Sequence, residues 1–175
     1  MTKSHKLNRN NVHSHKQAQA TSVRRDPQAA TAYCSRGCAH GLKGEYDKAI
    51  ADWTRAIRLD PKLVEAYSNR GLAYAKTDEY DKALVDLTEA IRLDPKRAST
   101  YTVRGIVYQV KGEDDKSIVD FTKAISLNPT DAMAYYQRSL AYRRIGEHDK
   151  SLADFTEAIR LDPQLAAAIV DLTQD

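Results

Sequence analysis

Few prolines interrupt the sequence, and none lies outside one fixed interval. The five prolines of the 175-residue chain follow one another at steps of 34 residues: Pro27, Pro61, Pro95, Pro129 and Pro163. A fixed period of this size is typical of stacked supersecondary units. It favours a repeat array, whose core lies between neighbouring units, over an ordinary domain with one central core.

Long apolar runs are absent, and cysteine is rare. No stretch is long and apolar enough to cross a bilayer, and residues 1–10 lack the apolar segment of a secretory signal. The two cysteines, Cys34 and Cys38, lie four residues apart on one predicted helix, which is a poor placement for a disulfide. We therefore expect a protein that is not exported, that resides in the reducing cytoplasm and that has no membrane partner.

Acidic residues are missing from one end of the chain. Residues 1–25 contain six basic residues and no acidic one, whereas residues 26–175 hold the other 21 basic residues and all 24 acidic ones. The excess positive charge therefore belongs to the first segment, and the remainder offers no overall positive field for nucleic acid or anionic lipid. Low apolar content and a single charge sign predict a disordered tail over residues 1–25. One folded solenoid is expected over residues 26–175.

Motifs of catalysis are also missing. The sequence has no phosphate-binding glycine loop, no nucleophile motif and no metal-spaced His–Glu pattern. His40 occupies the position that tyrosine fills in the other repeats, so we interpret it as a core aromatic substitute. The thiols of Cys34 and Cys38 would need two further ligands to hold zinc. We therefore predict no catalytic residue, no cofactor and no metal.

The hexapeptide AIRLDP recurs along the chain. It occupies residues 56–61, 90–95 and 158–163, and AISLNP occupies residues 124–129. In the second repeat Tyr67, Gly71 and Tyr74 recur at i, i+4 and i+7, which is one face of a helix. Each unit shows two such helical patterns. The units are 30–63, 64–97, 98–131 and 132–165, followed by residues 166–175, which we interpret as a capping helix.

The unit boundaries carry residues that end helices. Gly44, Gly112 and Gly146 separate the two halves of their units, where glycine takes the left-handed helix-ending conformation without steric cost. Unit two has Asp78 there, which we expect to cap the following helix. In AIRLDP, Asp60 is predicted to accept from free backbone amides, with Pro61 at a first helical position.

A second set of glycines lies inside the first helices. Glycine within a helix costs about 1 kcal/mol relative to alanine, so its presence needs a packing reason. We expect close helix approach there, with large residues of the second helix filling the gap. The glycines are Gly37, Gly71 and Gly105, replaced by Ser139 in unit four, and the partners are Trp53, Leu87, Phe121 and Phe155.

This 34-residue unit resembles the tetratricopeptide repeat. The resemblance covers about residues 27–165 and implies an all-α, right-handed superhelical solenoid of antiparallel helix pairs. It also implies a concave surface that binds a peptide or helix of a partner protein. Unit two carries the family pattern as Tyr67, Gly71, Tyr74, Ala83, Leu87 and Pro95.

The resemblance places the binding groove on the first helix of each unit, opposite the glycines. Its composition suits a segment with small apolar side chains and an acidic end near Arg143 and Arg144. The predicted groove residues are Cys34, Cys38, Leu42, Ser68, Asn69, Leu72, Lys76, Thr102, Ile106, Gln109, Tyr136, Leu140, Arg143 and Arg144.

One branch of the family grips acidic chaperone tails through a clamp of Lys, Asn, Asn, Lys and Arg. The matching positions here are Cys34, Cys38, Asn69, Ser99 and Val103. Asn69 alone agrees with the clamp. We therefore expect no chaperone clamp.

The chain departs from the family pattern in two charged columns, which lie 16 residues apart. They are Arg36, Arg70, Arg104 and Arg138, and Asp52, Asp86, Asp120 and Asp154. Both columns can be solvated, or each arginine can pair with the aspartate of the packed second helix. We favour the paired ladder, because a partly buried guanidinium needs its charge satisfied and its planar fork suits a carboxylate.

These observations predict a non-enzymatic scaffold or adaptor that binds a protein segment in its groove. Two alternatives stay open. The basic tail can recruit nucleic acid or ribonucleoprotein, although it has no aromatic residue for base stacking, so nucleic acid is not the expected partner. If residues 166–175 cap the array incompletely, the array can also self-associate through its solenoid ends.

Overall fold

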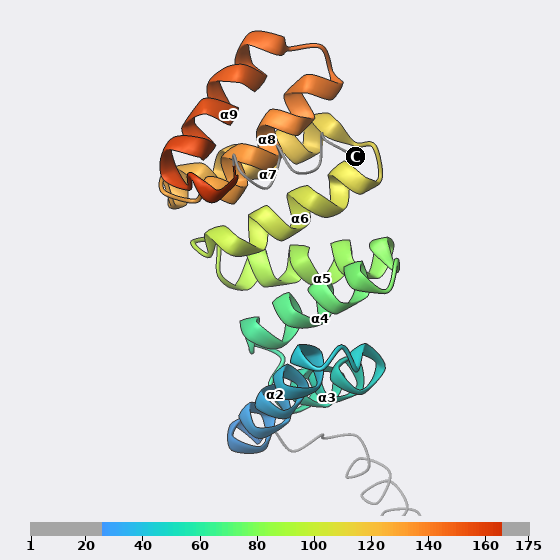
Figure 1. Cartoon of the computed structure of the whole chain (residues 1–175). Helices are drawn as coiled ribbons and strands as arrows, with labels where there is room; N and C mark the ends of the chain where they lie inside the picture. Colours follow the sequence, from blue (N-terminus) through green and yellow to red (C-terminus); the bar gives the residue numbers. More distant parts are fainter. Residues whose placement is uncertain (1–25, 166–175) are drawn as a thin grey trace, which may run out of the picture.

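The computed structural model describes residues 26–165, which form eight α-helices and no strand (Figure 1). The predicted tail 1–25 and capping helix 166–175 lie outside the described residues. Within residues 26–165 no helix is long and apolar enough to span a membrane. The helices are α2 (Pro27–Leu42), α3 (Tyr46–Leu59), α4 (Val64–Lys76), α5 (Tyr80–Leu93), α6 (Ala98–Val110), α7 (Asp114–Leu127), α8 (Ala132–Arg144) and α9 (His148–Leu161).

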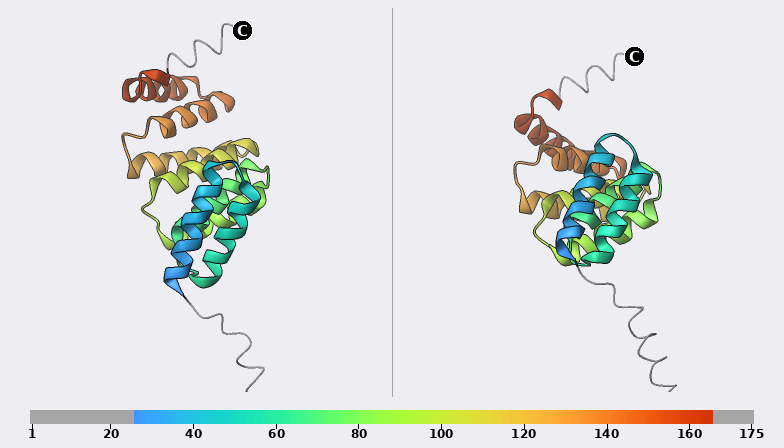
Figure 2. Two further views of the ribbon diagram at one scale, coloured as in Figure 1. Left: turned by 60° about the horizontal axis from the view of Figure 1, so that its bottom comes forward. Right: turned by 90° about the horizontal axis from the view of Figure 1, so that it is seen from below.

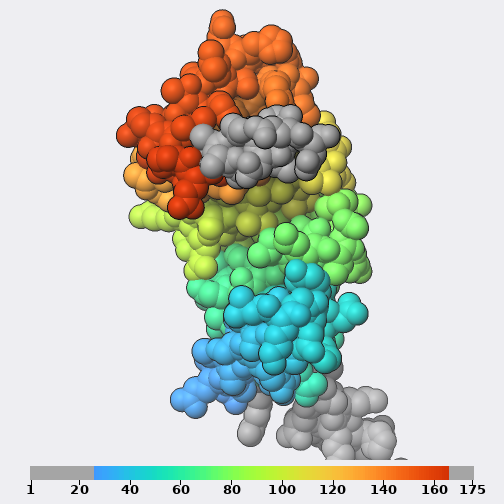
Figure 3. Space-filling model, viewed as in Figure 1, coloured from blue at the N-terminus to red at the C-terminus, as the bar shows by residue number. Residues whose placement is uncertain are grey.

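The helices form four antiparallel pairs that stack in chain order, as the sequence predicts (Figures 1 and 3). The later pairs are turned relative to the first, so that the stack twists (Figure 2). Cα atoms of α2, α4 and α6 each come within 8 Å of the next first helix, whereas no second helix approaches the next second helix as closely. The stack is thus tighter on the side of α2, α4, α6 and α8, which places these helices on its concave side.

The turn inside each unit depends on one left-handed residue. Gly44, Gly112 and Gly146 have φ angles of 75°, 75° and 81°, which confirms their predicted role. Asp78 takes the same conformation with φ 61°, and its side chain accepts from no backbone amide in the first turn of α5. Its carboxylate accepts from the Tyr80 hydroxyl at 2.6 Å instead. The expectation that Asp78 caps α5 is therefore wrong, because the chain needs a left-handed residue at this position.

The Leu-Asp-Pro segments close turns and do not cap the next helix. The Asp60 carboxylate accepts from the Lys62 amide at 3.0 Å, and α4 begins only at Val64. Pro61 therefore lies in the turn, contrary to the prediction. The predicted geometry holds at the start of α2, where the Ala29 amide donates to Asp26 at 3.0 Å and Pro27 is the first helical residue.

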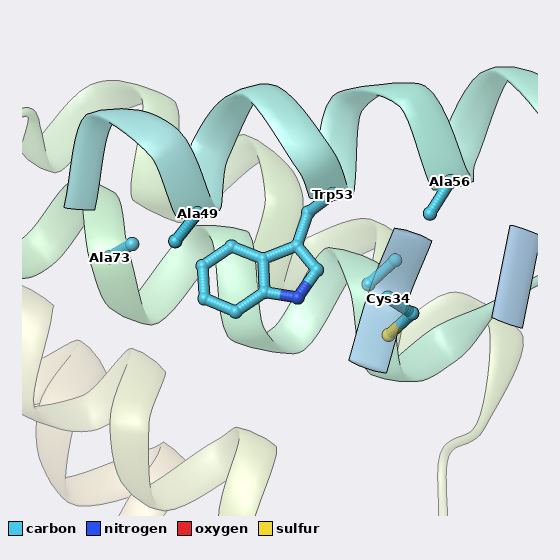
Figure 4. Packing of buried hydrophobic residues seen from close by; sticks show 6 residues of the cluster. Cys34, Ala49, Trp53, Ala56 and Ala73 are labelled. Carbon is cyan, nitrogen blue, oxygen red and sulfur yellow. The ribbon is translucent and has the colours of Figure 1, made fainter. Parts of the chain in front are cut away.

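The core lies where each glycine-bearing first helix meets its partner. The indole of Trp53 is buried with Ala49 and Ala56 of its own helix and with Cys34 of α2 (Figure 4). A Cβ atom placed on Gly37 would lie 2.8 Å from Trp53 Nε1. Equivalent close approaches join Gly71 to Leu87 and Gly105 to Phe121. The predicted partnership of small and large residues is thereby confirmed for these three pairs.

Candidate functional site

The predicted groove residues fall into three groups according to their solvent exposure. Leu42 and Leu72 are exposed by 91% and 41%, and Lys76, Arg143 and Arg144 are also exposed. A second group is half-buried: Cys38, Ser68, Asn69, Ile106, Tyr136 and Leu140. Three predicted residues, Cys34, Thr102 and Gln109, are buried.

The buried and half-buried polar groups join neighbouring units. The Asn69 amide donates to Cys38 Sγ at 3.3 Å, and the Ser68 hydroxyl lies 3.3 Å from that of Thr100. Gln109 Nε2 donates to the backbone carbonyl of Gln137 at 3.1 Å. First helices pack so closely that side chains of the predicted groove become inter-unit contacts.

Cys34, Thr102 and Gln109 are therefore not part of the open surface, contrary to the prediction. Thr102 Oγ1 lies 3.4 Å from Asp131 Oδ2, and Cys34 packs in the cluster around Trp53. Sequence periodicity selects the outward positions of each helix, but it does not reveal how close the next helix lies.

The residues that stay open form a largely apolar surface, which we call the concave surface. It comprises Leu42, Leu72, Lys76, Val110, Met133 and Arg143, one or two from each first helix. Val110 and Met133 are 57% and 44% exposed. Scattered apolar residues are common on protein surfaces, but these four apolar residues recur on successive first helices along one side of the stack.

At the basic end of the concave surface, the two neighbouring arginines of α8 differ in whether they already have partners. The Arg144 guanidinium donates to Asp114 Oδ1 at 3.0 Å through Nε and to the Gln109 carbonyl at 3.0 Å through Nη2. Arg144 thus ties α8 to α6 and α7. Arg143 is exposed and has no acidic partner within residues 26–165. Of the two arginines, Arg143 is the one available to an acidic ligand.

The structure brings together the two columns of the arginine–aspartate ladder. Arg70 Nε and Nη2 donate to the two carboxylate oxygens of Asp86 at 2.7 and 2.8 Å. Arg104 with Asp120 and Arg138 with Asp154 repeat this fork at 2.6–2.8 Å. The fork of Arg36 with Asp52 has distances of 2.6 and 2.5 Å.

Each later arginine also bonds the preceding unit, which the sequence reading missed. Arg70 Nη1 donates to Thr54 Oγ1 of α3 at 2.9 Å, and Arg104 and Arg138 reach Thr88 and Thr122 at 3.2 and 2.9 Å. The guanidinium of Arg70 also lies 5.9 Å from the ring centroids of Tyr67 and Tyr74. The sequence does contain a pattern that could have predicted this contact, because a threonine precedes each of these arginines by 16 residues.

Electrostatics agree with a structural role for the ladder. The hydrogen bond from Arg36 holds the pKa of Asp52 below its ordinary value, despite partial burial. The bonds to Asp120 and Asp154 raise the pKa of Arg104 and Arg138. The two charges of each pair satisfy each other, which fits a structural role.

The thiol of Cys34 is buried and protonated. Burial, followed by the neighbouring Cys38, raises the pKa of the Cys34 thiol to about 11. A thiol with this pKa is protonated at neutral pH and is neither a good nucleophile nor a good ligand. Within residues 26–165 no cluster of three His, Cys, Asp or Glu side chains could hold a metal ion.

His40 lies in the tyrosine position but makes polar contacts. Its Nδ1 lies 2.5 Å from Glu45 Oε2, and its Nε2 lies 3.9 Å from Asp52 Oδ2. The side chain is 27% exposed. His40 therefore replaces an aromatic core residue with a polar link between the end of α2 and the start of α3.

A separate open depression of about 630 Å³ lies where α4 meets α5. It is lined by Tyr67, Arg70, Leu84, Val85, Asp86, Thr88 and Glu89. Arg70 and Asp86 already satisfy each other there, so the depression offers Tyr67, Leu84 and Val85 as its apolar contacts. None of its lining residues belongs to the predicted groove.

The geometry is that of a helical repeat protein, and sequence comparison identifies the family. A profile described as TPR repeat matches residues 42–78. Profiles described as tetratricopeptide repeat match residues 64–97, 98–131 and 132–165. The chain therefore belongs to the tetratricopeptide repeat family.

Solved structures share the fold. A crystal structure of MamA is 29% identical, covers 89% of each chain and has a TM-score of 0.74. The TPR domain of OM64 from Arabidopsis is 26% identical over 69% of this chain and 97% of its own, with a TM-score of 0.63. The first TPR of Spaghetti (RPAP3), bound to the HSP90 peptide SRMEEVD, is 22% identical over 71% and 99%, with a TM-score of 0.69. No curated protein matches the chain.

Proposed function

We propose that this protein is a scaffold without catalytic activity of its own, which binds a segment of a partner protein on its concave surface. The family and the fold support a protein-interaction role. The observation that carries the proposal is the row of exposed apolar side chains Leu42, Leu72, Val110 and Met133 on successive first helices.

The chemistry of the concave surface favours a particular kind of segment. Exposed aliphatic and thioether side chains suit small apolar side chains of a peptide or helix. Arg143, at the end of this surface, suits a carboxylate that the partner places beside it. An apolar segment with an acidic residue at one end therefore fits best.

The proposed ligand differs from that of the RPAP3 domain, which is shown with a chaperone peptide. Asn69 is the one residue here that matches the clamp for such peptides, and its amide already bonds Cys38 Sγ. The chain also lacks the clamp's cationic side chains at Cys34, Ser99 and Val103. We therefore do not propose a chaperone-tail ligand.

Selection from a library of displayed random peptides on the immobilised full chain tests the proposal. We expect enriched peptides to combine apolar residues with a terminal Asp or Glu. The double variant Leu72→Glu, Val110→Glu should weaken their binding by about tenfold or more, since charges would replace the central apolar contacts. Arg143→Glu should weaken the acidic peptides selectively.

The matched control is Val85→Glu, Val119→Glu, which places the same charges on exposed valines of the second helices. It should leave peptide binding unchanged. Equal binding by the wild type and the Leu72, Val110 variant would refute the concave surface as the site. A further variant with the six basic residues of 1–25 replaced by glutamine tests the tail, and loss of binding in it alone would assign recognition to the tail.

A further inference from the structure

Three internal interfaces of the solenoid use one repeated set of contacts. At each of them an aliphatic, a threonine and an isoleucine of a second helix face the next first helix. Ile50 and Ile57 pack in one cluster with Ala66 and Ala73 of α4, and Thr54 accepts from Arg70 between them. The same residue types recur one and two periods later, as Leu84, Thr88 and Ile91 and as Ile118, Thr122 and Ile125. Leu84 packs with Val107 of α6, Ile125 packs with Ala134 of α8, and the two threonines accept from the arginines of these helices.

The side of each first helix that contacts the preceding second helix, which we call the receiving face, is equally regular. On α4, α6 and α8 the ladder arginine lies between two small or medium-sized residues, which are 0–2% exposed. They are Ala66 and Ala73 in α4, Thr100 and Val107 in α6, and Ala134 and Ala141 in α8. Contact with the preceding second helix therefore covers this face in three of the four units.

The first unit presents the same face, and within residues 26–165 no second helix covers it. Ala32 and Ala39 occupy the two small-residue positions of α2, and both are exposed. Between them the Arg36 side chain is 59% exposed, against 15–17% for Arg70, Arg104 and Arg138. Its fork to Asp52 is complete, but Nη1 donates to no described residue. We call Ala32, Arg36 and Ala39 the front face.

The fourth unit presents the complementary half. Leu152, Thr156 and Ile159 of α9 occupy the aliphatic, threonine and isoleucine positions. Leu152 is 66% exposed, and the Thr156 hydroxyl donates to the Leu152 carbonyl of its own helix at 2.8 Å, its one bond among the described residues. We call these three residues the rear face. The two faces are the halves of a contact that the chain already forms three times.

Each end segment of the chain carries one residue of these halves, Val23 and Ala168, but neither carries the full set. At the arginine position of the period, residues 166–175 have Leu172, which cannot donate to Thr156. Upstream, Lys16 and Ala20 stand where an aliphatic residue and a threonine would be needed opposite the front face. A second copy of this chain supplies both halves.

We propose that the rear face of one chain binds the front face of another, so that the solenoid continues from copy to copy. Thr156 of one copy accepts from Arg36 Nη1 of the next, while Leu152 and Ile159 cover Ala39 and Ala32. A head-to-tail contact of this kind uses different surfaces on the two partners and does not close on itself, so it extends into longer assemblies. It is independent of ligand binding on the concave surface.

Light scattering after size exclusion, over a concentration series of the full chain, measures the expected association. The mass should rise above that of one chain as concentration increases. A front-blocked variant, Ala32→Gln with Ala39→Gln, and a rear-blocked variant, Leu152→Lys with Thr156→Lys, should each remain at one chain. All four positions are exposed, so these changes leave folding intact.

The mass of a mixture of the two blocked variants tests directly whether the rear face binds the front face. The front-blocked chain keeps its rear face and the rear-blocked chain keeps its front face, so the mixture should double in mass and grow no further. The control Ala51→Gln, Ala153→Gln, at exposed positions on second helices, should behave as the wild type.

Three results would overturn the proposal. They are a one-chain mass at every concentration, blocked variants that still assemble alone, and a mixture that stays at one chain. Association that appears only after residues 1–25 or 166–175 are removed would assign the faces to those segments and would equally refute a second copy as the occupant.

Discussion

A Cβ atom on Gly105 would lie 2.6 Å from Cε1 of Phe121, which is closer than packed carbon atoms tolerate. The phenyl ring is fully buried, so it has no free space into which to move. Gly71 and Leu87 show the same relationship, with the Cβ position 2.9 Å from Leu87 Cγ. The mid-helix glycines are thus the counterparts of large core residues.

Gly105→Ala should lower the free energy of unfolding by about 1–3 kcal/mol, because overpacking outweighs the better helix propensity of alanine. Urea unfolding followed by circular dichroism measures the change. Adding Phe121→Leu should recover part of the loss. Gly112→Ala is the comparison, since no atom lies within 4 Å of its Cβ position; a loss of about 1 kcal/mol there would come from the positive φ alone. An unchanged midpoint for Gly105→Ala would contradict the steric account.

The arginine–aspartate pairs of the ladder should contribute unequally to the free energy of unfolding. Arg70→Leu leaves Asp86 buried without its charge partner, and we expect a loss of about 3–5 kcal/mol in the free energy of unfolding. Arg36→Leu should cost less than Arg70→Leu, because the Arg36 side chain is 59% exposed against 15% for Arg70, so solvent already screens its pairing with Asp52. Chemical denaturation of both variants measures the difference.

A double-mutant cycle with Arg70→Leu and Asp86→Asn isolates the pair itself. Its coupling energy should be about 0.5–3 kcal/mol. A coupling indistinguishable from zero would mean that the two charges are solvated independently, which is the alternative that the sequence leaves open.

Stability should fall in acid partly through Glu45. Hydrogen bonds from Lys48 and then His40 lower the pKa of Glu45 to about 2 in the folded chain, against about 4.3 when unfolded. The folded pKa is depressed, so this contribution is present above about pH 4.3 and is lost as the pH falls towards 2. The midpoint of thermal unfolding between pH 6 and pH 2.5 should decline less steeply for Glu45→Gln than for the wild type. Parallel curves would contradict this attribution.

Cys34 should resist alkylation in the native protein. Its pKa of about 11 lies more than two units above that of an ordinary thiol, so iodoacetamide at pH 8 should react roughly a hundredfold more slowly than in urea. Mass spectrometry of peptides from a time course gives the rate at each cysteine, with half-buried Cys38 as the internal reference. Native modification of Cys34 at the unfolded rate would show that the thiol is not protected.

The fold follows from short-range information. The helix pairs, the left-handed glycines and the register of the units are readable from the 34-residue period, because each unit folds through contacts within itself and with its neighbours; the start of α4 at Val64, three residues after Pro61, is not. Asp78 shows the limit of such reading: its residue type suggests a cap, but the turn geometry forces the backbone conformation.

The concave surface was only half predictable. Helical periodicity correctly placed Leu72 on the exposed, outward side of its helix. It also predicted an outward position for Gln109, which is buried. Gln109 is buried because α8 lies close enough for its amide to reach the Gln137 carbonyl. The distance between helices of different units depends on the summed packing of the core, which no single sequence window contains.

By itself the sequence determined the repeat, the helix pairs and the partnership of glycines with large residues, since these rest on backbone geometry and side-chain volume at a fixed spacing. The tertiary structure alone decided which outward residues stay open, that Arg70 reaches back to Thr54, and that Arg36 and Thr156 have no such counterpart within residues 26–165. The physical reason is that these features depend on how tightly successive pairs are stacked, and on where the stack of described helices begins and ends.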